Sequence, residues 1–154
     1  MFSQTGEYAL RVMVYLASRA GEPATNKQIS AATLVPRGYL AKILQTLSRA
    51  GLVKSQRGLH GGSILLGNSA ALSLYDVIQA VDPLRRIETC PLALTWHGRD
   101  LCPLHRRLDD AIGHVEKTLR QATIASLLTG RNESRHPLCL PRKPSKKNMP
   151  AKIT

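Results

Sequence analysis

Two cysteines twelve positions apart are the side chains of this sequence with the most evident capacity for chemistry. Cys90 and Cys102 bracket a stretch that contains Pro91 and Gly98, and Pro103 follows at once, a composition typical of a long loop. Loops of this length usually have a function. Thiols bind metals, undergo redox chemistry or are simply buried, and the residues alone leave these three options open.

The cellular setting that we expect for these thiols is the cytoplasm. The N-terminus lacks a basic region followed by an unbroken apolar run, and no stretch approaches the ~18 apolar residues of a membrane span. Cytoplasmic thiols stay reduced, so the three cysteines are not expected to form a disulfide framework. We also expect no enzyme, because the sequence has no phosphate-cradling glycine loop, no HExxH, no CxxC and no recognisable Ser/His/Asp set.

The stretch from residue 26 to residue 62 predicts two helices joined by a tight turn. The first helix, Lys27 to Thr33, ends before Pro36, because the residue preceding a proline is pushed out of the α region. A second helix starts at Pro36 and has an apolar stripe made of Leu40, Ile43, Leu44 and Leu47. The polar side chains off that stripe, which a DNA major groove could meet, are Arg37, Tyr39, Lys42, Gln45 and Arg49.

A short hairpin follows this helix pair. Gly51 is expected to cap the second helix in the left-handed conformation, and strands are predicted over 52–55 and 63–66. The loop between the strands contains Arg57 and His60 among several glycines, so it can approach a phosphate backbone closely. The predicted fold class is mainly α with a small β wing, a winged helix-turn-helix.

The net charge favours a nucleic acid as the partner. The chain has 22 Lys and Arg against 10 Asp and Glu, a net charge of +12, and neutralised phosphates supply most of the sequence-independent affinity for DNA. Residues 1–80 hold 8 basic and 3 acidic residues, residues 81–128 hold 7 and 6, and residues 129–154 hold 7 and 1. The balanced middle is better suited to contact protein than phosphate.

Helical patterns flank the winged segment on both sides. Thr5 is expected to cap a first helix that runs up to Gly21, and Ser73 a helix over 74–81. A single helix of roughly two dozen residues is then predicted from its apolar seam, which consists of Leu104, Leu108, Ala111, Val115, Leu119, Ala122 and Leu127. We expect this seam to pair with its copy in a homodimer. The alternative is that the helix folds back onto the winged domain.

Several short motifs resemble one bacterial family. They are Gly6-Glu7-Tyr8-Ala9, Tyr39-Leu40, Gly51-Leu52-Val53, Ser55-Gln56-Arg57-Gly58, Gly61-Gly62 and Leu74-Tyr75-Asp76-Val77-Ile78. In this order and spacing they resemble the winged-helix transcription regulator family that includes IscR, NsrR, RirA and CymR, over roughly residues 1–128. The resemblance implies a homodimer whose long C-terminal helices cross, and palindromic operators in double-stranded DNA.

The resemblance also implies DNA contacts. Arg37, Tyr39 and Lys42 would read base edges or clamp phosphates at the start of the recognition helix, and Gln45 follows them. Arg57 resembles the arginine with which the family enters the minor groove, whose width and negative potential attract a guanidinium. His60 and Ser63 are further candidate contacts, although the family often has an aromatic residue where Ser63 stands.

The cysteines depart from the family pattern. Cluster-binding members place three cysteines at six-residue intervals, with a histidine three residues after the last in the IscR type. Here Cys90, Cys102 and His105 keep their places, but Trp96 occupies the middle position and cannot ligate iron. An iron–sulfur cluster normally takes four ligands, so one is missing. The candidates are His97 and Glu7, the latter from the other subunit.

Three states of this site stay open. The first is an altered iron–sulfur cluster, 2Fe–2S in preference to 4Fe–4S, and the second is a thiol switch, in which thiolates are favoured by the nearby Arg85, Arg86, Arg99 and Arg106. In the third, the site holds no cofactor, and a small ligand or a partner enzyme controls the protein. The expected organisation is a winged domain (1–82), a sensor loop (83–103), a dimerisation helix (104–128) and a disordered basic tail (129–154) that includes Cys139, a bystander. The predicted function is a homodimeric transcriptional regulator, with a repressor favoured. A basic RNA-binding module is the competing interpretation.

Overall fold

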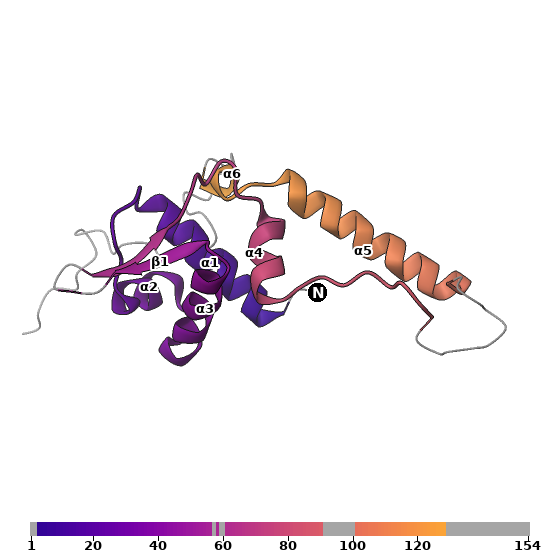
Figure 1. The fold of residues 1–154 in the computed structure, drawn as a ribbon, viewed down its shortest axis with the longest axis horizontal. Coiled ribbons are helices and arrows are strands. Elements are labelled where there is room, and N and C mark those ends of the chain that lie inside the picture. Colours follow the sequence, from indigo (N-terminus) through magenta and orange to yellow (C-terminus); the bar gives the residue numbers. More distant parts are fainter. Residues whose placement is uncertain (1–2, 57, 59–60, 91–100, 129–154) are drawn as a thin grey trace, which may run out of the picture.

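The computed structural model describes residues 3–56, 58, 61–90 and 101–128, and it has a compact head from which one long helix extends (Figure 1). In chain order the elements are α1 (Gln4–Ser18), α2 (Asn26–Thr33), α3 (Arg37–Arg49), β1 (Val53–Gln56), β2 (Gly62–Leu65), α4 (Leu74–Val81), α5 (Pro103–Gln121) and α6 (Ile124–Leu128). The winged helix-turn-helix fold is confirmed. Within the described ranges, no helix combines the length and apolar character needed to cross a membrane.

Helix α1 forms the centre of the head. Its apolar residues recur at helical spacing, and Ala9, Val12 and Met13 are fully buried against the other helices. The predicted cap at Thr5 is wrong: Ser3, in an extended conformation, accepts a hydrogen bond from the backbone N–H of Gly6 at 3.2 Å. A Cβ at Gly6 would lie 2.9 Å from Ile78 Cδ1, so this glycine permits the close approach of α1 and α4.

The turn between α2 and α3 is fixed by local interactions. Thr25 and Gln28 form a capping box at the start of α2, and Leu34 ends this helix with a left-handed φ of 59°. The hydroxyl of Ser30 then donates to the carbonyl of Val35 at 2.8 Å, and α3 begins directly after Pro36. Gly51, with φ of 73°, closes α3 as predicted.

The wing is an antiparallel hairpin in which Val53 pairs with Leu65 and Gln56 with Gly62, each strand one residue away from its predicted bounds. The hairpin is tied to the head by Ala24, whose N–H donates to the Ser63 carbonyl at 3.0 Å and whose carbonyl accepts from the Ser63 N–H at 2.8 Å. A Cβ at Gly62 would lie 2.6 Å from the Ala24 backbone, so this glycine serves packing. Ser63 is buried and is therefore a poor candidate for a DNA contact.

The predicted single helix from Leu104 to Leu127 is wrong beyond Gln121. Ala122 is extended, with φ of −95° and ψ of 134°. Its carbonyl accepts from the N–H of Leu74, and the N–H of Ile124 donates to the Leu72 carbonyl, both at 2.9 Å. These bonds turn the chain back to the head, where α6 packs on α1 and Ile124 is fully buried in the core. Part of the seam therefore folds back, whereas α5 itself extends outward (Figure 1).

Candidate nucleic-acid interface and metal centre

The two faces of α3 are separated as the sequence predicted. Leu40, Ile43, Leu44 and Leu47 are buried in the head. The five polar side chains that the sequence assigned to the other face are all exposed, namely Arg37, Tyr39, Lys42, Gln45 and Arg49. The helix therefore presents a polar, basic surface while its apolar stripe fixes its orientation.

Tyr39 has a second role besides exposure to solvent. Its side chain is 53% exposed, and its ring lies edge-on to the ring of Tyr8 with centroids 6.2 Å apart. Tyr8 in turn accepts a hydrogen bond from Gln4 at 2.9 Å. The ring pair ties the first turn of α3 to α1, so Tyr39 orients the recognition helix as well as offering a contact.

A hollow of about 340 Å³ separates α3 from the wing. Its lining residues are Asn26, Ala41, Leu44, Gln45, Ser48, Arg49, Ser55 and Ser63. Gln45 and Arg49 are one helical turn apart, so they reach this hollow together. Asn26, Ser48 and Ser55 were missed by the sequence reasoning, because only the docking of the hairpin beside α3 gives them a common position. Arg57 and His60 lie outside the described residues, so their roles in the wing stay predictions.

Cys90, Cys102 and His105 converge on one point. The Nδ1 atom of His105 lies 3.1 Å from the Sγ of Cys102 and 3.6 Å from the Sγ of Cys90, and the three donor atoms lie within 4.8 Å of one another. All three side chains are partly exposed. The sequence pattern named these three residues, and the structure brings them together.

Two elements position these ligands. Cys102 is the N-cap residue of α5, and His105 lies in the first turn of that helix. Cys90 comes from the extended segment 82–90, here called the strap, which follows α4 and runs beside α5 (Figure 1). The group therefore joins the strap to the start of α5.

The other proposed ligands are not part of this group. Glu7 lies on α1, where its carboxylate forms an ion pair with Arg11, and its side chain is 58% exposed. Within one chain the structure does not bring Glu7 to the cysteines, so a role across a dimer stays a prediction. Trp96, His97 and Cys139 lie outside the described residues.

A clamp that the sequence reasoning missed fastens the strap to α5. The guanidinium of Arg86 donates to both carboxylate oxygens of Asp109, at 2.7 and 2.5 Å, and the N–H of Ile87 donates to the same carboxylate at 2.9 Å. The Arg86 hydrogen bond, followed by that of Ile87, lowers the pKa of Asp109 to about 2. Gly113 leaves room for the guanidinium, because a Cβ there would lie 3.0 Å from Arg86 Nη1.

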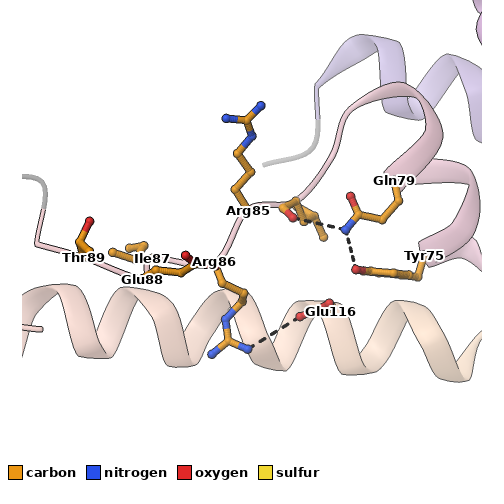
Figure 2. Close-up of a pocket in the computed structure, with 9 residues that line it drawn as sticks. Tyr75, Gln79, Arg85, Arg86, Ile87, Glu88, Thr89 and Glu116 are labelled. Carbon is orange, nitrogen blue, oxygen red and sulfur yellow. Dashed lines mark hydrogen bonds and ion pairs between the residues drawn. The ribbon is translucent and has the colours of Figure 1, made fainter. Parts of the chain in front are cut away.

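The clamp continues to α4 along a groove of about 720 Å³ (Figure 2). Glu116 lies 3.8 Å from Arg86 and 3.0 Å from Arg120, and hydrogen bonds from Tyr75 and Arg120 lower the pKa of its carboxyl. The Arg120 guanidinium lies over the Tyr75 ring at 3.5 Å, and Gln79 donates to the Tyr75 hydroxyl at 2.5 Å. The strap, α4 and α5 are thus linked by one polar network.

This network changes the electrostatic argument for a thiol switch. Arg86 was expected to favour a thiolate, but its charge is opposed by Asp109 and Glu116. Arg85 points away from α5 in Figure 2, and Arg99 lies outside the described residues. Arg85 and Arg86 therefore give little support to a thiolate at Cys90, and Arg106, exposed in the first turn of α5, is the flanking arginine that stays a candidate within the described residues.

Most of the sequence matches one family. Residues 2–130 match the profile of Rrf2, described as an iron-dependent transcriptional regulator. The chain belongs to this family. A relative, the HTH-type transcriptional regulator CymR of Bacillus subtilis (strain 168), is 30% identical over 138 residues, covering 86% of this chain and 94% of the relative. A putative HTH-type transcriptional regulator of Aquifex aeolicus (strain VF5) is 26% identical over 131 residues, covering 83% and 91%.

Solved structures agree with this assignment. T. potens IscR superimposes with a TM-score of 0.71 at 25% identity, covering 88% of this chain and 91% of its own. The structure of CymR (YrzC), the global cysteine regulator of B. subtilis, gives a TM-score of 0.69 at 28% identity, covering 86% and 98%. The Rrf2 chain described here is thus a DNA-binding transcriptional regulator, and its relatives are regulators rather than enzymes.

Proposed function

We propose that this Rrf2 regulator binds palindromic double-stranded DNA as a homodimer and acts as a repressor whose affinity depends on the group Cys90, Cys102 and His105. The observation that carries the proposal is the exposure pattern of two helices. The polar face of α3 is exposed beside the hollow at the wing, and α5 extends away from the head with an uncovered apolar stripe. One surface suits DNA and the other suits a second copy of the chain.

The stripe on α5 supports the homodimer. Leu104, Leu108, Ala111 and Val115 follow one another in steps of four, three and four residues. Ala111 is exposed, and the three larger side chains are 62%, 47% and 39% exposed. Leu119, in the same seam, is buried. Large apolar side chains gathered on one exposed helix face are typical of an interface rather than of a solvated surface.

The dimer supplies the geometry for a palindrome. Two α3 helices related by a twofold axis would enter successive major grooves, with half-sites one helical turn or a multiple apart. Arg37, Lys42 and Gln45 would then contact bases or phosphates, and Arg57 and His60 would extend the contact from the wing. Each phosphate contact that is removed should lower the salt slope by about 1.

The strap connects the group Cys90, Cys102 and His105, here called the sensing group, to the head that carries α3. Cys90 ends the strap, and the strap follows α4 directly, while α4 packs on both α1 and α3. A change that draws Cys90 toward the start of α5, or releases it, therefore acts on the connection between the head and the dimerisation helix. Misplacing one head relative to the other would lose the contacts of one half-site.

Redox state, iron and nitric oxide are the signals that the family resemblance suggests for an iron–sulfur site here. The donor chemistry of two thiols and an imidazole suits iron or zinc. When bound, a metal would supply a bridge between strap and helix. Cys90, Cys102 and His105 are the residues that would hold it.

The proposal is tested by fluorescence anisotropy with DNA from the upstream region of the regulator's own gene and with a scrambled duplex of equal length and composition. The natural duplex should bind more tightly at every salt concentration. Lys42→Ala and Gln45→Ala should weaken binding to the natural duplex, and Lys117→Ala, an exposed position on α5, should bind it as the unaltered chain does. Equal affinity for both duplexes would refute sequence-specific recognition, and tighter binding to structured RNA would support the competing function.

A further inference from the structure

The sensing group has a geometry that thiol hydrogen bonds do not explain. The Sγ atoms of Cys90 and Cys102 approach the same Nδ1 atom of His105. That nitrogen carries either one lone pair or one N–H, according to the tautomer, so it forms a linear hydrogen bond with one sulfur and not with both. Although Cys102 is the N-cap residue, its sulfur makes no capping hydrogen bond to the helix. Convergence of two sulfurs and one nitrogen is the arrangement of ligands around a shared cation.

The separations lie within about 1 Å of those around one tetrahedral ion. With metal–sulfur bonds of ~2.3 Å and metal–nitrogen bonds of ~2.05 Å, tetrahedral angles place sulfur and nitrogen about 3.6 Å apart and two sulfurs about 3.8 Å apart. The observed sulfur–nitrogen distances are 3.1 and 3.6 Å, and no two of the three donor atoms are more than 4.8 Å apart. Small movements of the side chains would complete the site.

The same separations do not fit an iron–sulfur cluster. Each iron of a 2Fe–2S cluster already holds two sulfides and accepts two protein ligands, and each iron of a 4Fe–4S cluster accepts one. Three protein ligands must therefore include a pair on different irons. The two ligand atoms of such a pair lie roughly 5.5 Å or more apart, because the iron–iron separation lies between two metal–ligand bonds of ~2.3 Å. All three donor atoms here lie closer together than that.

The fold holds the three donors in place without the ion. Cys102 and His105 are three residues apart in the first turn of α5, which places them on one face. Cys90 is held by the clamp, because the N–H of Ile87, three residues earlier, donates to Asp109, one helical turn beyond His105. Such a site needs little further ordering when it binds a metal.

We infer that Cys90, Cys102 and His105 bind one divalent transition-metal ion of the zinc or ferrous type, rather than an iron–sulfur cluster. This inference rests on the proposed function only in taking the group as the sensing site. Two thiolates and an imidazole select a borderline-soft ion with a tetrahedral preference. The partial exposure of all three side chains leaves the fourth position accessible to water or to a small external ligand. A single ion would join the strap to α5 and so stabilise the arrangement that the clamp already favours.

The test uses the full chain stripped of metal under a reducing, oxygen-free atmosphere and titrated with Co²⁺ alone. We expect one cobalt per chain, the intense visible bands of tetrahedral cobalt and a thiolate-to-cobalt charge-transfer band, all abolished by Zn²⁺. Cys90→Ser, Cys102→Ser and His105→Gln should each weaken cobalt binding more than about 100-fold, beyond the losses that second-shell changes cause. His114→Gln, an exposed histidine on the same helix, is the matched control and should bind cobalt as before.

A parallel sample is reconstituted with ferrous iron and sulfide. Iron without acid-labile sulfide supports the single ion, whereas iron and sulfide in equal amounts, retained on gel filtration, would overturn it. Octahedral cobalt, or tight binding that survives Cys102→Ser, would overturn it too. The DNA titration is repeated with the zinc form and the metal-free form. A single ion that leaves DNA affinity unchanged would support the single-ion site and refute metal control in the proposed function. A cluster that alters DNA affinity would refute the single-ion site and support metal control.

Discussion

Leu108→Glu tests the homodimer at the centre of the exposed stripe. Leu108 lies between Leu104 and Val115 on the outer face of α5 and is 47% exposed in the single chain. A glutamate there would hardly disturb the isolated chain, because the position already faces solvent and glutamate is a good helix former. In a dimer the same carboxylate would be buried against the apolar stripe of the second copy.

The magnitude follows from the exposed fractions. Fully burying an aliphatic side chain contributes ~1.5–3 kcal/mol, so covering the exposed parts of Leu104, Leu108 and Val115, which are 62%, 47% and 39% exposed, contributes about 3 kcal/mol per chain. Leu108 accounts for about 1 kcal/mol of this in each chain. The change removes that contribution twice and adds the desolvation of two carboxylates. We expect a loss of at least about 3 kcal/mol, which weakens dimerisation by 100-fold or more.

The assay is sedimentation velocity over a range of protein concentrations, with circular dichroism to verify that the helical content is unchanged. Gln121→Glu is the matched control, since it adds the same charge at an exposed position of α5 off the stripe. The control should remain a dimer where Leu108→Glu is a monomer. A Leu108→Glu dimer as tight as the unaltered one would exclude the stripe as the interface, and a monomeric unaltered chain at micromolar concentration would exclude the homodimer.

Three further predictions concern the head and the clamp. Ile124→Ala should lower the free energy of unfolding by about 2–4 kcal/mol, because it leaves a cavity where α6 enters the core; a loss under about 1 kcal/mol in urea titration would contradict that docking. Leu34→Gly should raise the free energy of unfolding by about 1 kcal/mol, because a side chain that is 62% exposed contributes little packing and a φ of 59° strains any residue with a Cβ. A lower free energy of unfolding in the same titration would show that the contacts of Leu34 stabilise the fold by more than its backbone strain costs. The folded pKa of Asp109, lowered to about 2 chiefly by Arg86, lies below the unfolded value near 4, so its stabilisation is complete above about pH 4 and is lost as pH falls toward 2. Asp109→Asn should therefore be less stable than the unaltered chain at neutral pH, with a difference that shrinks between pH 4 and 2; a difference independent of pH would refute the linkage.

Local patterns in the sequence predicted most elements of the head. The stripe Leu40, Ile43, Leu44 and Leu47 repeats at the helical period, and every member is buried. Ser73 caps α4 through a capping box with Asp76, as its position before an apolar run predicted. The cap at Ser3 was missed in favour of Thr5, because both residues are good caps and the choice depends on where the chain becomes extended. The two strands, predicted over 52–55 and 63–66, are observed over Val53–Gln56 and Gly62–Leu65.

Two glycines of the family motifs allow close packing between elements, a role that the sequence had not predicted. Gly62 was assigned to a loop that approaches phosphate, yet it allows the wing to pack on the Ala24 backbone. Gly6 likewise allows α1 to approach Ile78 on α4. The sequence shows that a glycine has no side chain, but it does not show which distant element packs into the space. That element is known only once the chain is folded.

Helical periods by themselves predicted the winged helix-turn-helix and the exposed polar face of α3, because a period is a local property, whereas the resemblance to a family singled out Cys90, Cys102 and His105. Only the tertiary structure decided that the last helix breaks at Ala122, that Arg86 is held by Asp109, and that the two sulfurs meet at one nitrogen. The contacts of Arg86 with Asp109 and of Cys90 with His105 join residues 15 or more positions apart. The break at Ala122 depends on backbone groups of Leu72 and Leu74 in the head, which form hydrogen bonds with this part of the chain. Their positions follow from the path of the folded chain, which no local pattern contains.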